Sequence, residues 1–147
     1  MANSRSKPKA SKVRFEETKD KNDGSSSVKI TFSFKSFLGQ DSKGNGQDLE
    51  KWQEDKILSN LLDKLKHLSN LTRQKAHAEN SLVIYGKFPE NSDFACPQHL
   101  SEIQDWGTIR KLGCGGKVRV AGYYSENSVF NIVFLDKEHR FFPTDIN

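Results

Sequence analysis

Hydrophobic and polar residues alternate along residues 28–37, which read VKITFSFKSF. Val28, Ile30, Phe32 and Phe34 take every second position, and Lys, Thr and Ser stand between them. A period of two places the apolar side chains on one face of an extended chain. The pattern therefore predicts a half-buried β-strand where the folded region begins, and the Gly- and Asn-rich stretch after it predicts a loop.

The periodicity changes to that of a helix over residues 48–77. Apolar residues recur there at intervals of three and four, as on one face of an α-helix. They are Leu49, Trp52, Ile57, Leu58, Leu61, Leu62, Leu65, Leu68 and Leu71. Asp48 is a favourable N-cap, and the polar pair Ser69–Asn70 predicts a break, so we expect a long helix and then a short one. The residues expected to include the core face are Leu58, Leu61, Leu62 and Leu65.

Strand patterns dominate the rest of the chain. Residues 80–88 predict a short strand or an extended connector, and residues 99–112 are mixed, with the spacing of one helical turn. Two β-rich runs follow at 117–124 and 128–136, and residues 137–143 form a further short strand or a tail. The order is a strand, a helical hairpin and a meander of strands. It predicts an α+β fold with helices on one face of a C-terminal antiparallel sheet.

Composition divides the chain into an arm and one domain. Only 34% of the 147 residues are hydrophobic and the mean hydropathy is −0.74, which is too polar for a chain packed from end to end. Residues 1–27 contain Ser, Lys, Asp and Asn with very few apolar residues. We expect this segment to be a disordered basic arm and residues 28–147 to form a single domain.

The net charge is +4 and the excess lies at the N-terminus. Residues 1–14 hold five of the 23 Lys and Arg residues and none of the 19 Asp and Glu residues. Such an arm favours contact with nucleic acid or another anion; its alternative role is to keep the chain soluble. Because the sequence has neither a membrane-spanning apolar run nor a signal peptide, and its two cysteines suit a reducing compartment, we expect a cytoplasmic protein that does not contact membrane.

Two motifs that could carry chemistry have simpler explanations. GCGGK at 113–117 has the glycines of a phosphate-binding loop but not its Lys-Ser/Thr ending or the helix after it, so a turn is expected. Cys96, His99, Cys114 and His139 could form a tetrahedral zinc site. Only the first two are close in sequence, whereas zinc motifs contain two close pairs. We therefore expect neither a metal nor a cofactor.

The last hairpin carries many cationic and aromatic polar groups. Alternation along 117–124 places Lys117, Arg119 and Tyr123 on one face and Tyr124 on the other. The arginine fork suits phosphate, and a tyrosine ring suits a stacked base. The hairpin therefore predicts either a binding site for an anionic, stacked ligand or the ordinary solvent-facing side of a sheet.

Residues 113–143, which include the stretch GGKVRVAGYYSENSVFNIVFLDKEHRFF, resemble the RelE/ParE superfamily of small bacterial toxins. Those sequences commonly run through a segment with Gly and Arg, a strand, a short turn, an apolar strand and a His/Arg-aromatic ending. Over residues 28–143, the first strand and the Leu-rich helices follow the superfamily's order of elements. The chain departs from it by its basic arm and its 80–112 segment, and its end lacks a clear catalytic tyrosine.

The resemblance implies a RelE/ParE-like fold and a bacterial or phage toxin-antitoxin system. Members are ribosome-associated mRNA endonucleases or gyrase inhibitors that an antitoxin holds silent. For this chain it implies a metal-independent endoribonuclease, with RNA or the ribosome and an antitoxin-like protein as partners. The implied catalytic residues are Arg119, Tyr123 and His139, and the implied RNA- or phosphate-binding residues are Lys117, Tyr124 and Arg140. The alternative is a non-catalytic adaptor that binds nucleic acid or a protein through the basic arm and the C-terminal sheet.

Overall fold

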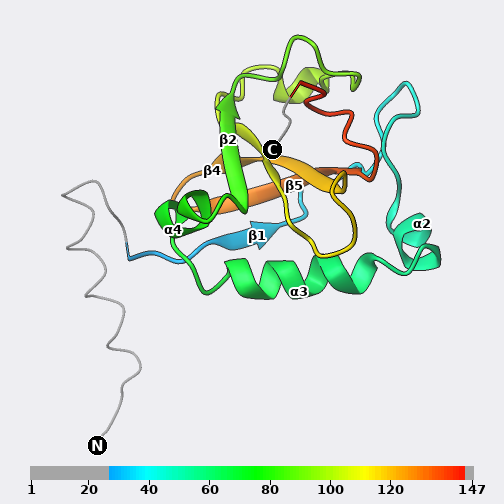
Figure 1. The fold of residues 1–147 in the computed structure, drawn as a ribbon. Helices are drawn as coiled ribbons and strands as arrows, with labels where there is room; N and C mark the ends of the chain where they lie inside the picture. The colour runs from blue at the N-terminus through cyan, green and yellow to red at the C-terminus, as the bar shows by residue number, and fades with distance from the viewer. Residues whose placement is uncertain (1–26, 145–147) are drawn as a thin grey trace, which may run out of the picture.

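The structure, a computed structural model, describes residues 27–144 and has an α+β fold (Figure 1). Its strands are β1 (Thr31–Ser33), β2 (Leu82–Gly86), β3 (Trp106–Ile109), β4 (Arg119–Ser125) and β5 (Val129–Asp136). Its helices are α2 (Leu49–Glu54), α3 (Leu58–Leu68), α4 (Arg73–Ala78) and the short 3-10 helix η3 (Gln98–Leu100). The predicted arm at 1–27 lies outside the described residues except for Ser27. No helix within 27–144 is both long and apolar enough to cross a membrane.

The five strands form one mixed sheet in the order β1-β5-β4-β3-β2. Strands β2 to β5 are an antiparallel meander, as predicted for the C-terminal part of the chain. Strand β1 pairs with β5 in parallel, with Thr31 opposite Val129. The chain leaves β1, passes through the three helices to the far edge of the sheet, and returns strand by strand until β5 lies beside β1. The sheet is therefore not purely antiparallel.

The helical region contains one more break than its hydrophobic pattern predicted. Asp48 caps α2 as expected, accepting the backbone N–H of Lys51 at 2.8 Å. Helix α2 then ends at Glu54, and Lys56 adopts a left-handed conformation with φ of 62° before α3 begins. The predicted interruption at Ser69–Asn70 is confirmed between α3 and α4. The result is three short helices, with α3 the longest.

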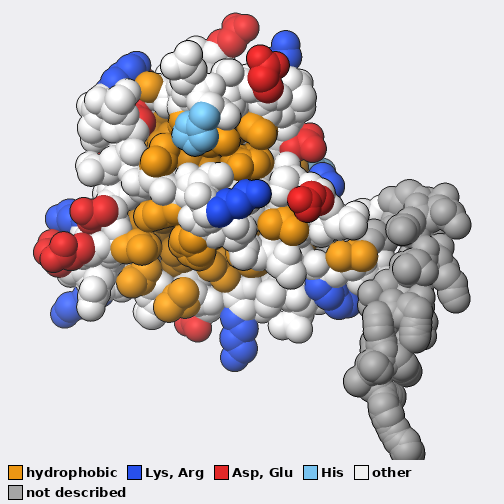
Figure 2. Space-filling view, turned by 180° about the vertical axis from the view of Figure 1, so that it is seen from behind, with side chains coloured by type: hydrophobic (Ala, Val, Ile, Leu, Met, Phe, Trp, Pro, Cys, Tyr) orange, Lys and Arg blue, Asp and Glu red, His pale blue; other side chains and the backbone are white. Residues whose placement is uncertain are grey.

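One side of α3 packs against the sheet. This buried side includes fewer of the leucines than the sequence pattern predicted. Leu61 and Leu68 are completely buried, and Leu58 and Leu65 are partly buried against the same core. Leu62, which was expected near this face, has 57% of its surface exposed. Figure 2 shows hydrophobic side chains reaching the surface on the back of the molecule. Among residues 27–144, the large hydrophobic residues that are well exposed, on any face, are Phe34, Leu38, Leu49 and Leu62.

Both faces of the sheet are covered, which the sequence did not predict. The helices cover one face, while η3, its flanking loops and the C-terminal segment lie over the other (Figure 1). The second core is largely aromatic, and Phe141 is its centre, with ring contacts to Phe88, Phe94, Trp106 and Phe134. Because irregular segments form this layer, the second face of the hairpin is buried instead of facing solvent.

Strand β5 contains a bulge at its centre. Ala121 pairs with Phe134 and Gly122 pairs with Ile132, so one extra residue stands on β5 between these partners. As a result, Val133 and Phe134 both belong to the aromatic core, although strict alternation would place them on opposite faces. Along β4 the alternation holds.

Candidate functional site

Arg119, the central residue of the predicted site, is buried in the sheet. It lies on β4 with only 5% of its surface exposed, directly opposite Asp136 on β5. Its Nη1 donates to the carbonyl oxygens of Gly116 at 2.8 Å and Val118 at 3.2 Å. These bonds hold the strand to the turn that precedes it. In this arrangement the guanidinium supports the fold and does not face solvent.

Asp136, at the end of β5, holds the turn that contains His139 and Arg140. The sequence analysis did not identify this residue. Its carboxylate accepts the backbone N–H groups of Arg140 at 2.9 Å and Phe141 at 2.8 Å. Burial raises the pKa of this carboxyl, and those two hydrogen bonds and the charge of Arg119 oppose the increase. Asp136 thereby fixes the turn that places His139 and Arg140. An acidic residue at the end of an apolar strand, followed by a charged turn, was the signal available in the sequence.

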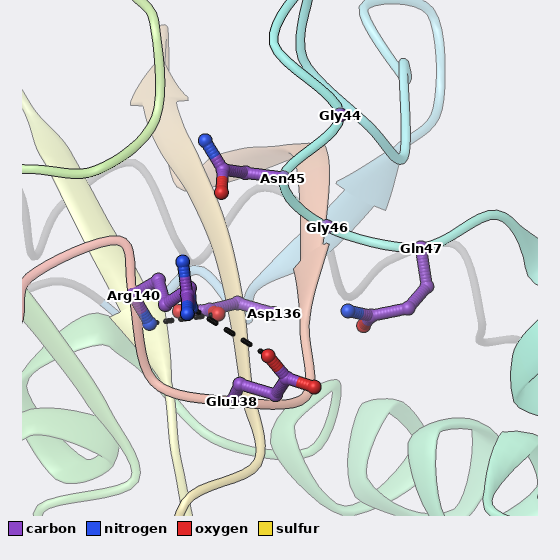
Figure 3. Close-up of a pocket in the computed structure, with 7 residues that line it drawn as sticks. All are labelled: Gly44, Asn45, Gly46, Gln47, Asp136, Glu138 and Arg140. Atoms are coloured by element: carbon purple, nitrogen blue, oxygen red, sulfur yellow. Dashed lines mark hydrogen bonds and ion pairs between the residues drawn. The ribbon is translucent and has the colours of Figure 1, made fainter.

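A polar pocket of about 300 Å³ opens beside Asp136 (Figure 3). Its lining, which we call the Asp136 pocket, consists of Gly44, Asn45, Gly46, Gln47, Asp136, Glu138 and Arg140. Arg140 has a half-exposed side chain and lies 3.5 Å from a carboxylate oxygen of Glu138 and 3.9 Å from one of Asp93. Two carboxylates and one guanidinium give the lining an excess of negative charge. The pocket therefore suits a polar or cationic group better than a phosphate.

The amides of the Asp136 pocket already hold the surrounding loops together. Asn45 donates through Nδ2 to the carbonyl oxygen of Asp93 at 2.7 Å. The Gln47 Oε1 atom accepts from Trp52 Nε1 at 2.8 Å and from the backbone N–H of Lys137 at 2.9 Å. These contacts join the loop before α2 to the turn after β5. The polar side chains of the Asp136 pocket can therefore be explained by their structural role in joining these segments.

The two tyrosines point to opposite faces of β4, as the alternation predicted, and neither is exposed. Tyr123 belongs to the aromatic core, and its hydroxyl is 2.8 Å from Ser36 Oγ. Tyr124 lies in the helix-side core, where its ring packs edge-on against Phe130. Burial raises the pKa of Tyr124 to about 12, and the charge of Arg73 offsets part of that increase. The structure does not bring these hydroxyls together at one surface.

The remaining predicted residues lie at the end of the sheet where β4 begins and β5 ends. Lys117 is exposed two residues before β4. His139 is half-buried and has a left-handed backbone with φ of 62° in the turn held by Asp136. The structure thus brings Arg119 and the backbone of Arg140 to one carboxylate, with His139 in the same turn, and leaves the two tyrosines in separate cores. Among residues 27–144, no three His, Cys, Asp or Glu side chains form a group able to hold a metal ion.

A second polar surface, at the opposite end of β5, was not predicted. The described chain begins there, beside α4 (Figure 1). Lys29 forms a β-bridge with Thr72, and the backbone N–H of Ile30 donates to the carbonyl oxygen of Leu71 at 3.0 Å. The exposed cations of this region, which we call the basic end, are Lys29, Lys66, Arg73 and Lys75. Their signal in the sequence is the absence of Asp and Glu from residues 24–40 and 64–78.

Comparison of the chain with protein-family models, with curated proteins and with solved structures finds no match.

Proposed function

We propose that this chain is a non-catalytic adaptor that binds nucleic acid. The observation that carries the proposal is the burial of the hairpin residues that would perform catalysis. Arg119, Tyr123 and Tyr124 each have 6% or less of their surface exposed. General acid–base chemistry on a phosphate requires a proton-transfer group and a cation that reach the same substrate atom. The covered sheet offers no such pair among these three residues.

Binding needs only exposed cations, and the chain supplies them at one end. The basic segment at 1–14 precedes the point where the described chain enters the basic end. Cations that neutralise phosphates release counterions, which provides affinity without sequence recognition. The adaptor would therefore bind through the arm and the adjoining surface of the domain.

The test is RNA binding by the full chain and by a variant in which the arm cations are replaced. The substitutions are Arg5→Gln, Lys7→Gln, Lys9→Gln, Lys12→Gln and Arg14→Gln. We expect the wild type to bind a labelled RNA with strong salt dependence and the variant to bind more weakly with a shallower dependence. Binding by wild type that is unaffected by salt or by the arm substitutions would refute an electrostatic adaptor.

A second candidate is a RelE/ParE-like endoribonuclease of a toxin-antitoxin system, acting in the cytoplasm. It is supported by the order of elements, a strand, helices and an antiparallel meander. It is also supported by the position of Arg119 opposite Asp136 and of Arg140 in the turn that Asp136 holds. An antitoxin-like protein would then be the partner, and the ribosome or its mRNA the target. This candidate requires the turn after β5 to reach the scissile phosphate.

Expression of the chain from a tightly repressed promoter separates the two candidates. An endoribonuclease should stop growth and fragment mRNA, and Arg140→Ala should relieve both effects because Arg140 is exposed. Arg119→Ala is a poor probe because loss of this buried cation would also destabilise the fold. Growth that continues with intact mRNA, from a chain that still binds RNA in vitro, would leave the adaptor as the function.

A further inference from the structure

Arg73, one of the exposed cations of the basic end, has its guanidinium over an aromatic ring. Its Cζ lies 4.0 Å from the centroid of the Tyr124 ring. That ring is itself immobilised, because Tyr124 is buried and its centroid is 5.3 Å from that of Phe130. Arg73 nevertheless remains exposed. Its guanidinium therefore lies over the ring and can still be reached by a ligand from solvent.

This arrangement lowers the entropic cost of binding an anion. An arginine that is already ordered loses less side-chain freedom when it contacts phosphate than a freely rotating lysine does. A planar guanidinium is also a surface on which an unpaired base can stack. A base within a duplex cannot reach such a plane, so the geometry favours a single strand.

Three further exposed cations adjoin Arg73. Lys75 is on α4 with Arg73, Lys66 is on the last turn of α3, and Lys29 is bridged to Thr72 just before α4. The one acidic residue of α4 and its caps is Glu79, whose carboxylate is bound by Ser81 Oγ and by His67 Nε2. Asp63 on α3, Asp105 before β3 and Glu126 in the last hairpin are the other acids of the adjoining elements.

We propose that the basic end, with Arg73 stacked on Tyr124 at its centre, binds the backbone of single-stranded RNA. The proposal rests on the adaptor function and assigns it a place in the folded domain. Lys29, Lys66 and Lys75 contact neighbouring phosphates, while Arg73 contacts one phosphate and stacks on an unpaired base.

The test measures binding of the full chain to a fluorescently labelled single-stranded RNA oligonucleotide at several salt concentrations. Arg73→Gln should weaken binding roughly tenfold or more, because it removes a hydrogen bond to a charged group. It should also reduce the slope of log affinity against log salt by about 0.7. Arg73→Lys retains the charge, so it should keep the slope but lose affinity. Lys43→Gln makes the same change of charge in the loop before α2, far from α4 (Figure 1), and should bind like wild type.

The outcomes distinguish failure of this site from failure of the adaptor function. Wild-type affinity and slope in Arg73→Gln, combined with lost binding in the arm variant, would refute the site and leave the adaptor standing. Equal weakening by Lys43→Gln and Arg73→Gln would refute a localised site. Tighter binding of a duplex of the same length would overturn the preference for a single strand. Absence of RNA binding by the wild type would refute both proposals.

Discussion

Arg119 and Asp136 face each other across β4 and β5, and both are almost completely buried, with 5% and 1% of their surfaces exposed. Each also has a backbone role. Arg119 binds the carbonyl oxygens of the preceding turn, and Asp136 binds the N–H groups of the following one. These two buried residues therefore hold the turn before β4 and the turn after β5 at the open end of the hairpin.

Replacing Arg119 by Ala should strongly destabilise the protein. It would remove the positive charge that favours the buried Asp136 carboxylate, and leaving a buried charge uncompensated typically costs about 3–5 kcal/mol. Lys117→Ala is the matched control, because Lys117 is exposed two residues earlier and should change stability by less than about 0.5 kcal/mol. Urea unfolding measures both. Similar midpoints for the two variants would show that the buried charges do not depend on each other.

Tyr124 should make the protein sensitive to strongly alkaline pH. Burial raises its pKa from about 10 to about 12. The folded protein therefore holds this proton more tightly than the unfolded chain does. The resulting stabilisation is complete below about pH 10 and is lost as the pH rises to about 12.

Tyr124→Phe should lose less stability than wild type over that interval, by up to roughly 2–3 kcal/mol. The measurement is urea unfolding at several pH values between the two limits. Parallel curves of stability against pH for the two proteins would contradict a buried, protonated phenol. Phenylalanine keeps the aromatic ring that contacts the Arg73 guanidinium, so the comparison changes the phenol and retains that ring.

Leu61 and Leu62 on α3 provide a test of which side of the helix faces the core. Leu61 is completely buried, so Leu61→Ala should reduce the free energy of unfolding by about 2–5 kcal/mol. Leu62 is 57% exposed, and Leu62→Ala should cost less than about 0.5 kcal/mol. Thermal melting of the two variants gives the comparison. A larger loss for Leu62 would require a rotation of α3 about its axis.

Gly122 marks the tightest approach between β4 and β5. A Cβ atom at this position would lie 2.0 Å from the carbonyl oxygen of Asn131 and 2.8 Å from the ring of Phe130. Gly122→Ala should therefore destabilise the protein by about 1–3 kcal/mol or more. Gly116→Ala is the control, since a Cβ there has no neighbour within 4 Å. Equal melting temperatures would mean that the bulge beside Gly122 relaxes without cost.

Local patterns predicted the elements that depend on local chemistry. The cap at Asp48, the break at Ser69–Asn70 and the two faces of β4 follow from hydrogen-bonding groups and periodicity within a few residues. Strand β3 was missed because its four residues have charged and polar neighbours and show no alternation. The extra break at Lys56 was not predicted because no glycine or proline lies near it in the sequence.

The character of the site depended on contacts that no local pattern contains. Phe88, Phe94 and Phe141 are irregularly spaced in loops, yet they meet over the second face of the sheet and bury Tyr123. The burial of that face therefore could not be predicted from the alternation along the hairpin. Likewise, the basic end brings Lys29, just before β1, beside the α3–α4 segment, which is distant from it in the sequence.

The parallel pairing of β1 with β5 has a consequence for how the chain folds during synthesis. The first strand of the described chain acquires its only strand partner after nearly all of the other elements have been made. Contacts between such distant segments slow folding, because a long loop must close before they form. A chain emerging from the ribosome would thus carry β1 and its apolar residues unpaired until the last strand appeared. Truncation before β5 should yield a chain prone to aggregation through that unpaired strand.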